Sequence, residues 1–119
     1  MEVDSTAFIA RTKAYSLRII RLIDSLPKDD VARTLGHQLL RAGCSVSANY
    51  RAAGRAKSRA DFIAKMAMVE EECDETIHWL ELLVDSDRVK ADKVALLKQE
   101  GVEILSMVVA SMRTAKSRR

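Results

Sequence analysis

Apolar residues recur along the chain at alternating steps of three and four, the spacing that places them on one face of an α-helix. Residues typical of turns and caps interrupt this pattern. Pro27 follows the first segment, Gly54 follows the second, and Ser58 precedes Asp61 by three residues at the start of the third. The pattern predicts four helices, at about residues 5–25, 29–53, 59–86 and 92–115.

Helices of this length with short connections are expected to pack as antiparallel neighbours. The predicted fold is all-α, an antiparallel up-down-up-down four-helix bundle that forms one domain over residues 1–119. Asp92 is expected to cap the fourth helix, and the tail that begins at Thr114 is expected to fray.

The composition supports a helical, intracellular protein. Hydrophobic residues make up 48% of the chain and aromatic residues 4%, so the core must consist mainly of aliphatic side chains and Met. Cys44 and Cys73 lie within predicted helices, which favours buried thiols over a disulfide. No segment is apolar over a membrane-spanning length, and the start lacks the basic stretch of a signal peptide. We expect a cytoplasmic protein without membrane contact.

Two predicted helices carry more apolar surface than one bundle can bury. Apolar side chains cover about 220° of the fourth helix, whereas a packed surface helix needs a stripe somewhat over 100° wide. The first helix is similar. We therefore expect the chain to associate with copies of itself. On the second helix, small residues align and permit a close helix approach, either inside the bundle or between subunits: Gly36, Gly43, Ser47 and Gly54.

The sequence contains no convincing catalytic or metal-binding set. Glu75 and His78 have the Glu-x-x-His spacing of di-iron bundles, but such a site needs a second copy, and the only other histidine is His37. No serine or cysteine has a base and an orienting acid at helical spacing, and no glycine-rich loop follows a strand. We expect no enzymatic activity, no cofactor and no metal.

Two polar residues are expected to have structural roles. Glu72 lies at the edge of the apolar stripe near Trp79, so we expect it to be partly buried and paired with an arginine. Asn49 falls on the apolar face of the second helix, where we expect a buried hydrogen bond that fixes the register between helices.

Charge is distributed unevenly. The formal net charge is only +3, but residues 41–65 hold six basic residues and one acid, and residues 66–87 hold eight acids and no base. On the second helix and the following connection, a row of cations includes Arg33, His37, Arg41, Arg51, Arg55, Lys57 and Arg59. A second cluster begins with Arg113 and Lys116.

The basic row has two interpretations. It could follow the phosphates of a nucleic-acid strand, or it could form salt bridges with the acidic third helix, within or between subunits. Tyr50 is the one aromatic residue near the row that could stack on a base, so any nucleic-acid contact is expected to involve the backbone.

Several segments together resemble the four-helix bundle proteins of the 23S rRNA intervening-sequence family: RTKAYSLRIIRLIDSLP, SANYRAA, SRADF, EEECDET and WLELL. The likeness covers nearly the whole chain. It implies an antiparallel bundle that assembles as a homopentamer in the bacterial cytoplasm, without established enzymatic activity. The family is also similar to the accessory variability proteins of retroelements, which are basic pentamers that associate with reverse transcriptase and nucleic acid.

The leading hypothesis is a non-enzymatic homo-oligomer, a pentamer by this resemblance, whose basic surfaces contact the backbone of RNA or DNA. The alternative is a protein-interaction scaffold without a nucleic-acid role. Such a scaffold would bind a protein partner through the acidic third helix or through the remaining apolar surface.

Overall fold

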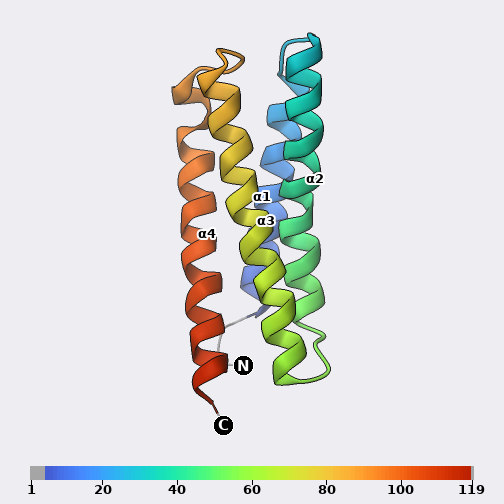
Figure 1. Ribbon diagram of the computed structural model, residues 1–119, viewed down its shortest axis with the longest axis vertical. Coiled ribbons are helices and arrows are strands. Elements are labelled where there is room, and N and C mark those ends of the chain that lie inside the picture. The colour runs from blue at the N-terminus through green and yellow to red at the C-terminus, as the bar shows by residue number, and fades with distance from the viewer. Residues whose placement is uncertain (1–4, 119) are drawn as a thin grey trace.

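The computed structural model describes residues 5–118 of the chain. It contains four helices, α1 (Ser5–Asp24), α2 (Asp30–Ala53), α3 (Arg59–Asp85) and α4 (Ala91–Ser117). No strand occurs within the described range, so the all-α class and the four helices are confirmed. The bundle measures 50 × 22 × 20 Å, and its helices lie along the long axis (Figure 1).

The connections between helices lie at the two ends of the bundle, so consecutive helices run in opposite directions (Figure 1). Each helix packs against two others: α1 and α3 both contact α2 and α4. The connection between α2 and α3, the start of α1 and the end of α4 all lie at the same end (Figure 1). Residues that are far apart in the sequence therefore meet there.

Most helix termini follow the predicted signals. Ser58 is the N-cap of α3, and its Oγ accepts a hydrogen bond from the backbone N–H of Asp61 at 3.0 Å. Asp29 caps α2 in the same way, with Oδ1 2.9 Å from the nitrogen of Ala32. Gly54 is the C-cap of α2, as predicted.

Two predictions about α4 are wrong. The helix begins at Ala91 after Lys90, which makes no side-chain cap bond, and Asp92 lies inside the first turn. A carboxylate is still favourable there, because it faces the positive end of the helix dipole. The C-terminal residues do not fray but stay helical to Ser117, since Met112 is buried and Ala115 packs against the core.

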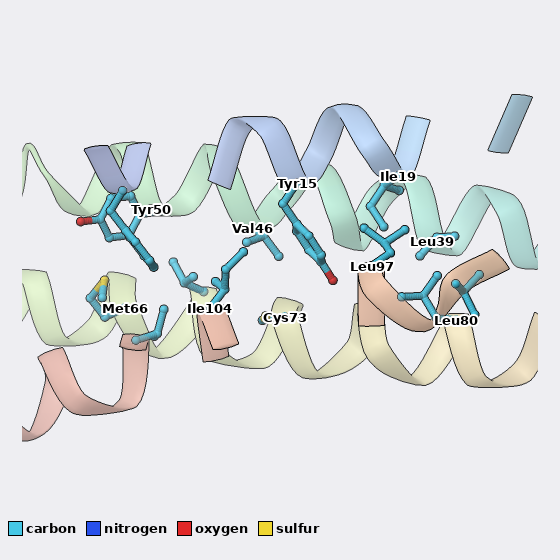
Figure 2. Packing of buried hydrophobic residues seen from close by; sticks show 14 of the residues in the cluster. Tyr15, Ile19, Leu39, Val46, Tyr50, Met66, Cys73, Leu80, Leu97 and Ile104 are labelled. Atoms are coloured by element: carbon cyan, nitrogen blue, oxygen red, sulfur yellow. The ribbon is translucent and has the colours of Figure 1, made fainter. Parts of the chain in front are cut away.

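The core consists of the apolar stripes of all four helices (Figure 2). Tyr15 extends from α1 across the core, and its hydroxyl lies against α3 and α4 near Ile77 and Gly101 (Figure 2). Cys73 is fully buried, and its thiol donates a hydrogen bond to the Gly101 carbonyl at 3.2 Å. Desolvation is the main reason that the pKa of Cys73 rises to about 12. Both cysteines are free, and Cys44 is half-buried.

The row of small residues on α2 mainly serves contact with α1 inside the bundle. A Cβ added to Gly43 would lie 2.9 Å from Cγ2 of Ile19, so the two helices touch at this point. Beside it, Ser16 Oγ donates to the Gly43 carbonyl at 2.7 Å and bonds Ser47 Oγ at 2.7 Å. The sequence permitted a close helix approach either inside the bundle or between subunits. In the structure this approach is between α1 and α2, inside the bundle.

The broad apolar faces of α1 and α4 are only partly covered. Ile19 and Ile104 are fully buried, but Leu17 remains 41% exposed and Val102 42% exposed. Leu96, near the start of α4, is 78% exposed. Within residues 5–118, none of the helices has the combined length and apolar character needed to cross a lipid bilayer.

Candidate nucleic-acid interface

Exposed cations gather where α2 ends, α3 begins and α4 ends (Figure 1). We call this group the basic end. It comprises Arg51, Arg55, Lys57, Arg59, Arg113 and Lys116, all exposed. The antiparallel course of the helices explains why two clusters that are separate in the sequence occupy one end of the molecule.

The carboxylates of the described residues hardly compensate the positive charge of the basic end. Within residues 5–118, none of its six side chains lies within 4.0 Å of a carboxylate. The nearby Asp61 is already engaged, because Lys65 Nζ contacts its Oδ1 at 2.6 Å and the Lys57 N–H donates to its Oδ2 at 3.0 Å. These bonds, that of Lys65 first, lower the pKa of Asp61. The cations of the basic end are thus left facing solvent.

Arg41, in the middle of the same basic row, has a different environment. Its Nη1 lies 3.1 Å from Glu72 Oε2, and its Nη2 contacts Glu75. Trp79 Nε1 donates to the same Glu75 oxygen at 3.1 Å. We call this group the α2–α3 clasp. Glu72 is only 17% exposed, so the partly buried, arginine-paired position expected for it is observed.

The two interpretations of the basic row therefore apply to different parts of it. Arg33 and Arg41 form ion pairs, the former with Asp30 one turn earlier. Arg51 and Arg55 do not form ion pairs within the described chain. His37 is exposed between Arg33 and Arg41.

The buried hydrogen bond predicted for Asn49 is instead made by Ser16 and Ser47. Asn49 is half-buried at the edge of the core-facing side of α2, beside Tyr50, which takes the buried position. Its side chain forms no hydrogen bond with other residues in the range 5–118. The projection of α2 overestimated its burial because Asn49 lies at the margin of the apolar stripe.

Glu75 and His78 contact other residues of the bundle. The Glu75 carboxylate is bound in the α2–α3 clasp, and the His78 ring packs edge-on against Trp79 at a centroid distance of 5.0 Å. Over the part of the chain that the structure describes, no three His, Cys, Asp or Glu side chains cluster as metal ligands.

A cavity of about 560 Å³ opens at the basic end, and it was not expected from the sequence. Phe8 and Phe62 form part of its wall, with Met107 beside them. Small residues leave the space, because α2 ends in an Ala-Gly sequence and α4 presents Ala110 and Ala115. Only the run of small residues at both helix ends could have indicated it.

A second groove, of about 590 Å³, lies between the end of α1 and the start of α4. Its cations include Arg21 and Lys93, which lie outside the two basic clusters expected from the sequence. Unlike the basic end, this region also carries acids: Asp92 lines the groove, and Asp29 pairs with Arg88 at 3.5 Å. Its positive charge is therefore partly compensated.

Comparisons with known proteins agree with this architecture. The model of a family described as 23S rRNA-intervening sequence protein matches residues 6–110. The fold is similar to a crystal structure from Bacteroides thetaiotaomicron VPI-5482, of a protein with unknown function from the S23 ribosomal protein family. The TM-score is 0.86 at 28% sequence identity, over 93% of this chain and 99% of that chain. No curated protein gives a significant match. The likeness in sequence and in fold thus extends over nearly the whole chain.

Proposed function

The chain belongs to the 23S rRNA-intervening sequence protein family, and we propose that it is a non-enzymatic homo-oligomer that binds the phosphate backbone of RNA or DNA through the basic end. One observation carries this proposal. The six cations of the basic end have no carboxylate partners within residues 5–118, whereas Arg11, Arg33, Arg41 and Arg88 each have at least one.

Unpaired cations that share one surface suit a polyanion. Each phosphate neutralised by a lysine or arginine releases condensed counterions, so affinity falls steeply as salt rises. Contacts of this kind orient a strand without reading its sequence. The basic end therefore supports binding with weak sequence preference.

Self-association is the second part of the proposal. Leu17 and Ile20 on α1 stay exposed, as does Val102 on α4. A neighbouring copy that covered these side chains would remove apolar surface from water, which favours assembly. We propose a pentamer because the family resemblance implies five subunits. Light scattering coupled to size-exclusion chromatography should give five times the 13.3 kDa chain mass, and a stable single chain would contradict assembly.

The absence of enzymatic activity is also a proposal. Three groups that could act as an acid or a nucleophile are occupied or inaccessible: Glu72 and Glu75 are held by Arg41, and Cys73 is buried with a raised pKa. A reactive thiol would need the opposite shift.

A salt titration tests nucleic-acid binding. Labelled RNA and single-stranded DNA would be titrated with wild type and with Arg51→Ala/Arg55→Ala, from about 50 to 200 mM salt. We expect the double variant to bind at least tenfold more weakly, with a shallower salt slope, since each phosphate contact contributes about one unit to that slope. The oligomer mass should not change.

A matched control distinguishes binding by a local surface from an effect of net charge alone. Arg21→Ala/Lys93→Ala removes two cations from the opposite groove and changes the net charge equally. An equal loss of affinity in both variants would contradict a local interface at the basic end. No binding at low salt by a correctly assembled wild type would exclude the nucleic-acid role.

That last outcome would favour the alternative, a protein-interaction scaffold. The observation in its favour is the exposed acidic surface of α3, which includes Glu71, Asp74 and Asp85. These carboxylates form no ion pair within the described chain and could receive a basic protein partner.

A further inference from the structure

The cavity at the basic end combines apolar walls with a positively charged surround. Phe8 and Phe62 contribute ring surface, and Arg59 contributes a charged side chain to the lining. Its volume of about 560 Å³ lies within the range of roughly 300 to 1,000 Å³ that is usual for ligand pockets. A fitting ligand therefore has an apolar part that enters and anionic parts that stay outside.

The aromatic wall is rigid. Phe8 packs edge-on against Tyr50 at a centroid distance of 4.5 Å, and both rings are buried. Rings held in this way lose little conformational freedom when a flat group packs on them. Stacking or edge contact between aromatic side chains and bases is the usual way in which proteins hold unpaired nucleotides.

The cations are spread around the cavity rather than concentrated at one point. Arg59 at the start of α3 and Arg118 at the end of α4 both line the cavity, and Arg55 and Lys57 are exposed beside Arg59 on the α2–α3 connection. Arg113 and Lys116 lie roughly 130° and 170° around α4 from the middle of its lining residues. A ligand with a single anionic head would engage only one side. A strand with a phosphate on each side of a base matches both.

We propose that this cavity holds one unstacked base of a single-stranded nucleic acid while the flanking phosphates contact the basic end. The proposal rests on the function proposed above and adds a preference for single strands. In a duplex the bases remain paired and stacked, so none is free to enter. Because the polar groups in the lining are the hydroxyls of Ser58, Ser111 and Thr114 and the guanidinium groups of Arg59 and Arg118, which also attract phosphates, the choice among bases should be weak.

The test compares a single-stranded RNA of about ten nucleotides with a duplex that presents the same number of phosphates. One base is replaced by 2-aminopurine, whose fluorescence rises when it leaves the base stack. We expect wild type to bind the single strand about tenfold more tightly than the duplex and to raise the fluorescence, because each stacked base typically contributes about a factor of ten or more.

Variants that fill the cavity without changing the charge make this test specific. Ala110→Leu and Thr114→Leu each place a larger side chain in the lining from exposed positions of α4, where leucine favours the helix. We expect either variant to bind the single strand as weakly as the duplex, with no change in duplex affinity. Ala95→Leu, exposed on the same helix outside the cavity, should behave as wild type. Because two variants fill the cavity independently, the test remains possible if one of them folds poorly.

The outcomes separate this proposal from the function on which it rests. Equal, salt-dependent binding of both nucleic acids by wild type would overturn the base pocket but leave backbone binding intact. Filled variants that keep the preference for single strands would also overturn it. A fluorescent fatty acid that binds wild type, is excluded by Ala110→Leu and is not displaced by the RNA would assign the cavity to an amphipathic small molecule instead. Failure of wild type to bind either nucleic acid would remove both proposals.

Discussion

Arg41 and Arg51 lie on the same helix about three turns apart, and both are exposed to solvent, yet their environments differ. Arg41 bridges α2 to α3 through Glu72 and Glu75 in the α2–α3 clasp. Arg51 has no carboxylate within reach in the described chain and belongs to the basic end. One arginine is part of the internal structure, and the other is available for a partner.

The same contrast extends to packing. In the middle of the bundle α1 and α2 approach so closely that Gly43 touches Ile19, whereas at the basic end small residues leave a cavity. Like charges that are not neutralised repel one another and oppose folding. Six such cations at one end of the bundle, beside an open cavity, are the observation on which the proposed binding surface rests. The predictions below test each side of this contrast.

The largest loss of stability is expected from a single methyl group added in the middle of the bundle, where α1 and α2 pack closely. In Gly43→Ala, the new Cβ would lie 2.9 to 3.2 Å from three atoms of Ile19, including its Cβ, so α1 must shift. Overpacking of this kind costs about 1–3 kcal/mol, against about 1 kcal/mol gained from helix propensity. We expect a net loss of up to about 2 kcal/mol in urea unfolding at fixed protein concentration.

Gly54→Ala is the matched control at the basic end. Gly54 has a helical φ of −63°. Among the described residues, an added Cβ would contact only the backbone carbonyl oxygen of Arg51, three residues earlier, at 3.4 Å. Stability should stay within about 0.5 kcal/mol of wild type or rise slightly. If both variants lost stability equally, the contrast in packing between the two regions would be wrong.

A second prediction uses pH to distinguish paired from unpaired arginines. Arg11 holds Glu100 through two bonds, both of 2.8 Å, and this contact lowers the pKa of the Glu100 carboxyl. A lowered pKa stabilises the fold above the unfolded value of 4.5, and the gain disappears as pH falls through the folded value. Glu100→Gln should therefore cost about 1 kcal/mol at pH 7 and little near pH 3.

Two controls accompany that measurement. Glu103→Gln, which removes a single 3.0 Å contact with Arg11 from a half-exposed position, should have a smaller effect. Arg51→Ala/Arg55→Ala should leave the pH dependence of unfolding as in wild type, since neither side chain has a carboxylate partner in the described chain. If the free energy of unfolding of the arginine variant fell less steeply with decreasing pH than that of wild type, these arginines would have an ion-pair partner, and the description of the basic end as unpaired would be wrong.

A third prediction concerns a buried polar group in the middle of the bundle that has no hydrogen-bond partner among the described residues. Tyr15 Oη is fully buried and is the one buried side-chain oxygen or nitrogen of the described residues without a hydrogen-bond partner. Desolvation accordingly raises the pKa of Tyr15. Tyr15→Phe removes a hydroxyl that gains nothing from the fold, so stability should be unchanged or higher by up to about 1 kcal/mol.

Ser16→Ala provides the comparison for Tyr15→Phe. The Ser16 hydroxyl bonds both the Gly43 carbonyl and Ser47, so its removal should cost about 1 kcal/mol. A loss of more than 1 kcal/mol in Tyr15→Phe would indicate that the tyrosine hydroxyl is hydrogen-bonded in solution.

These regions also differ in how far the sequence predicts them. Helical periodicity and cap residues depend on neighbours in the chain, so the four helices and the Ser58 cap were predictable, as was an arginine partner for Glu72. The basic end and its cavity depend on which helix termini meet. Phe8, Phe62 and Ala110 share no local pattern, and they come together only because three helix ends lie side by side. The prediction of a buried hydrogen bond for Asn49 was wrong for a related reason, since the burial of Asn49 depends on the exact rotation of α2 about its axis.

The smallest expected effect lies in the α2–α3 clasp itself. Arg41→Gln removes the ion pairs with Glu72 and Glu75, but the arginine is 48% exposed and Trp79 still donates to Glu75. Screened pairs of this kind contribute about 0.5 kcal/mol, so urea unfolding should show a loss of that size that shrinks at high salt. Arg51→Gln removes the same charge from the same helix and should show no loss, or a slight gain through reduced repulsion. RNA binding should respond in the opposite order, weakening in Arg51→Gln and staying near wild type in Arg41→Gln. If Arg41→Gln reduced binding as strongly as Arg51→Gln, the whole basic row would act as one surface, and the distinction between paired and unpaired arginines would carry no functional meaning.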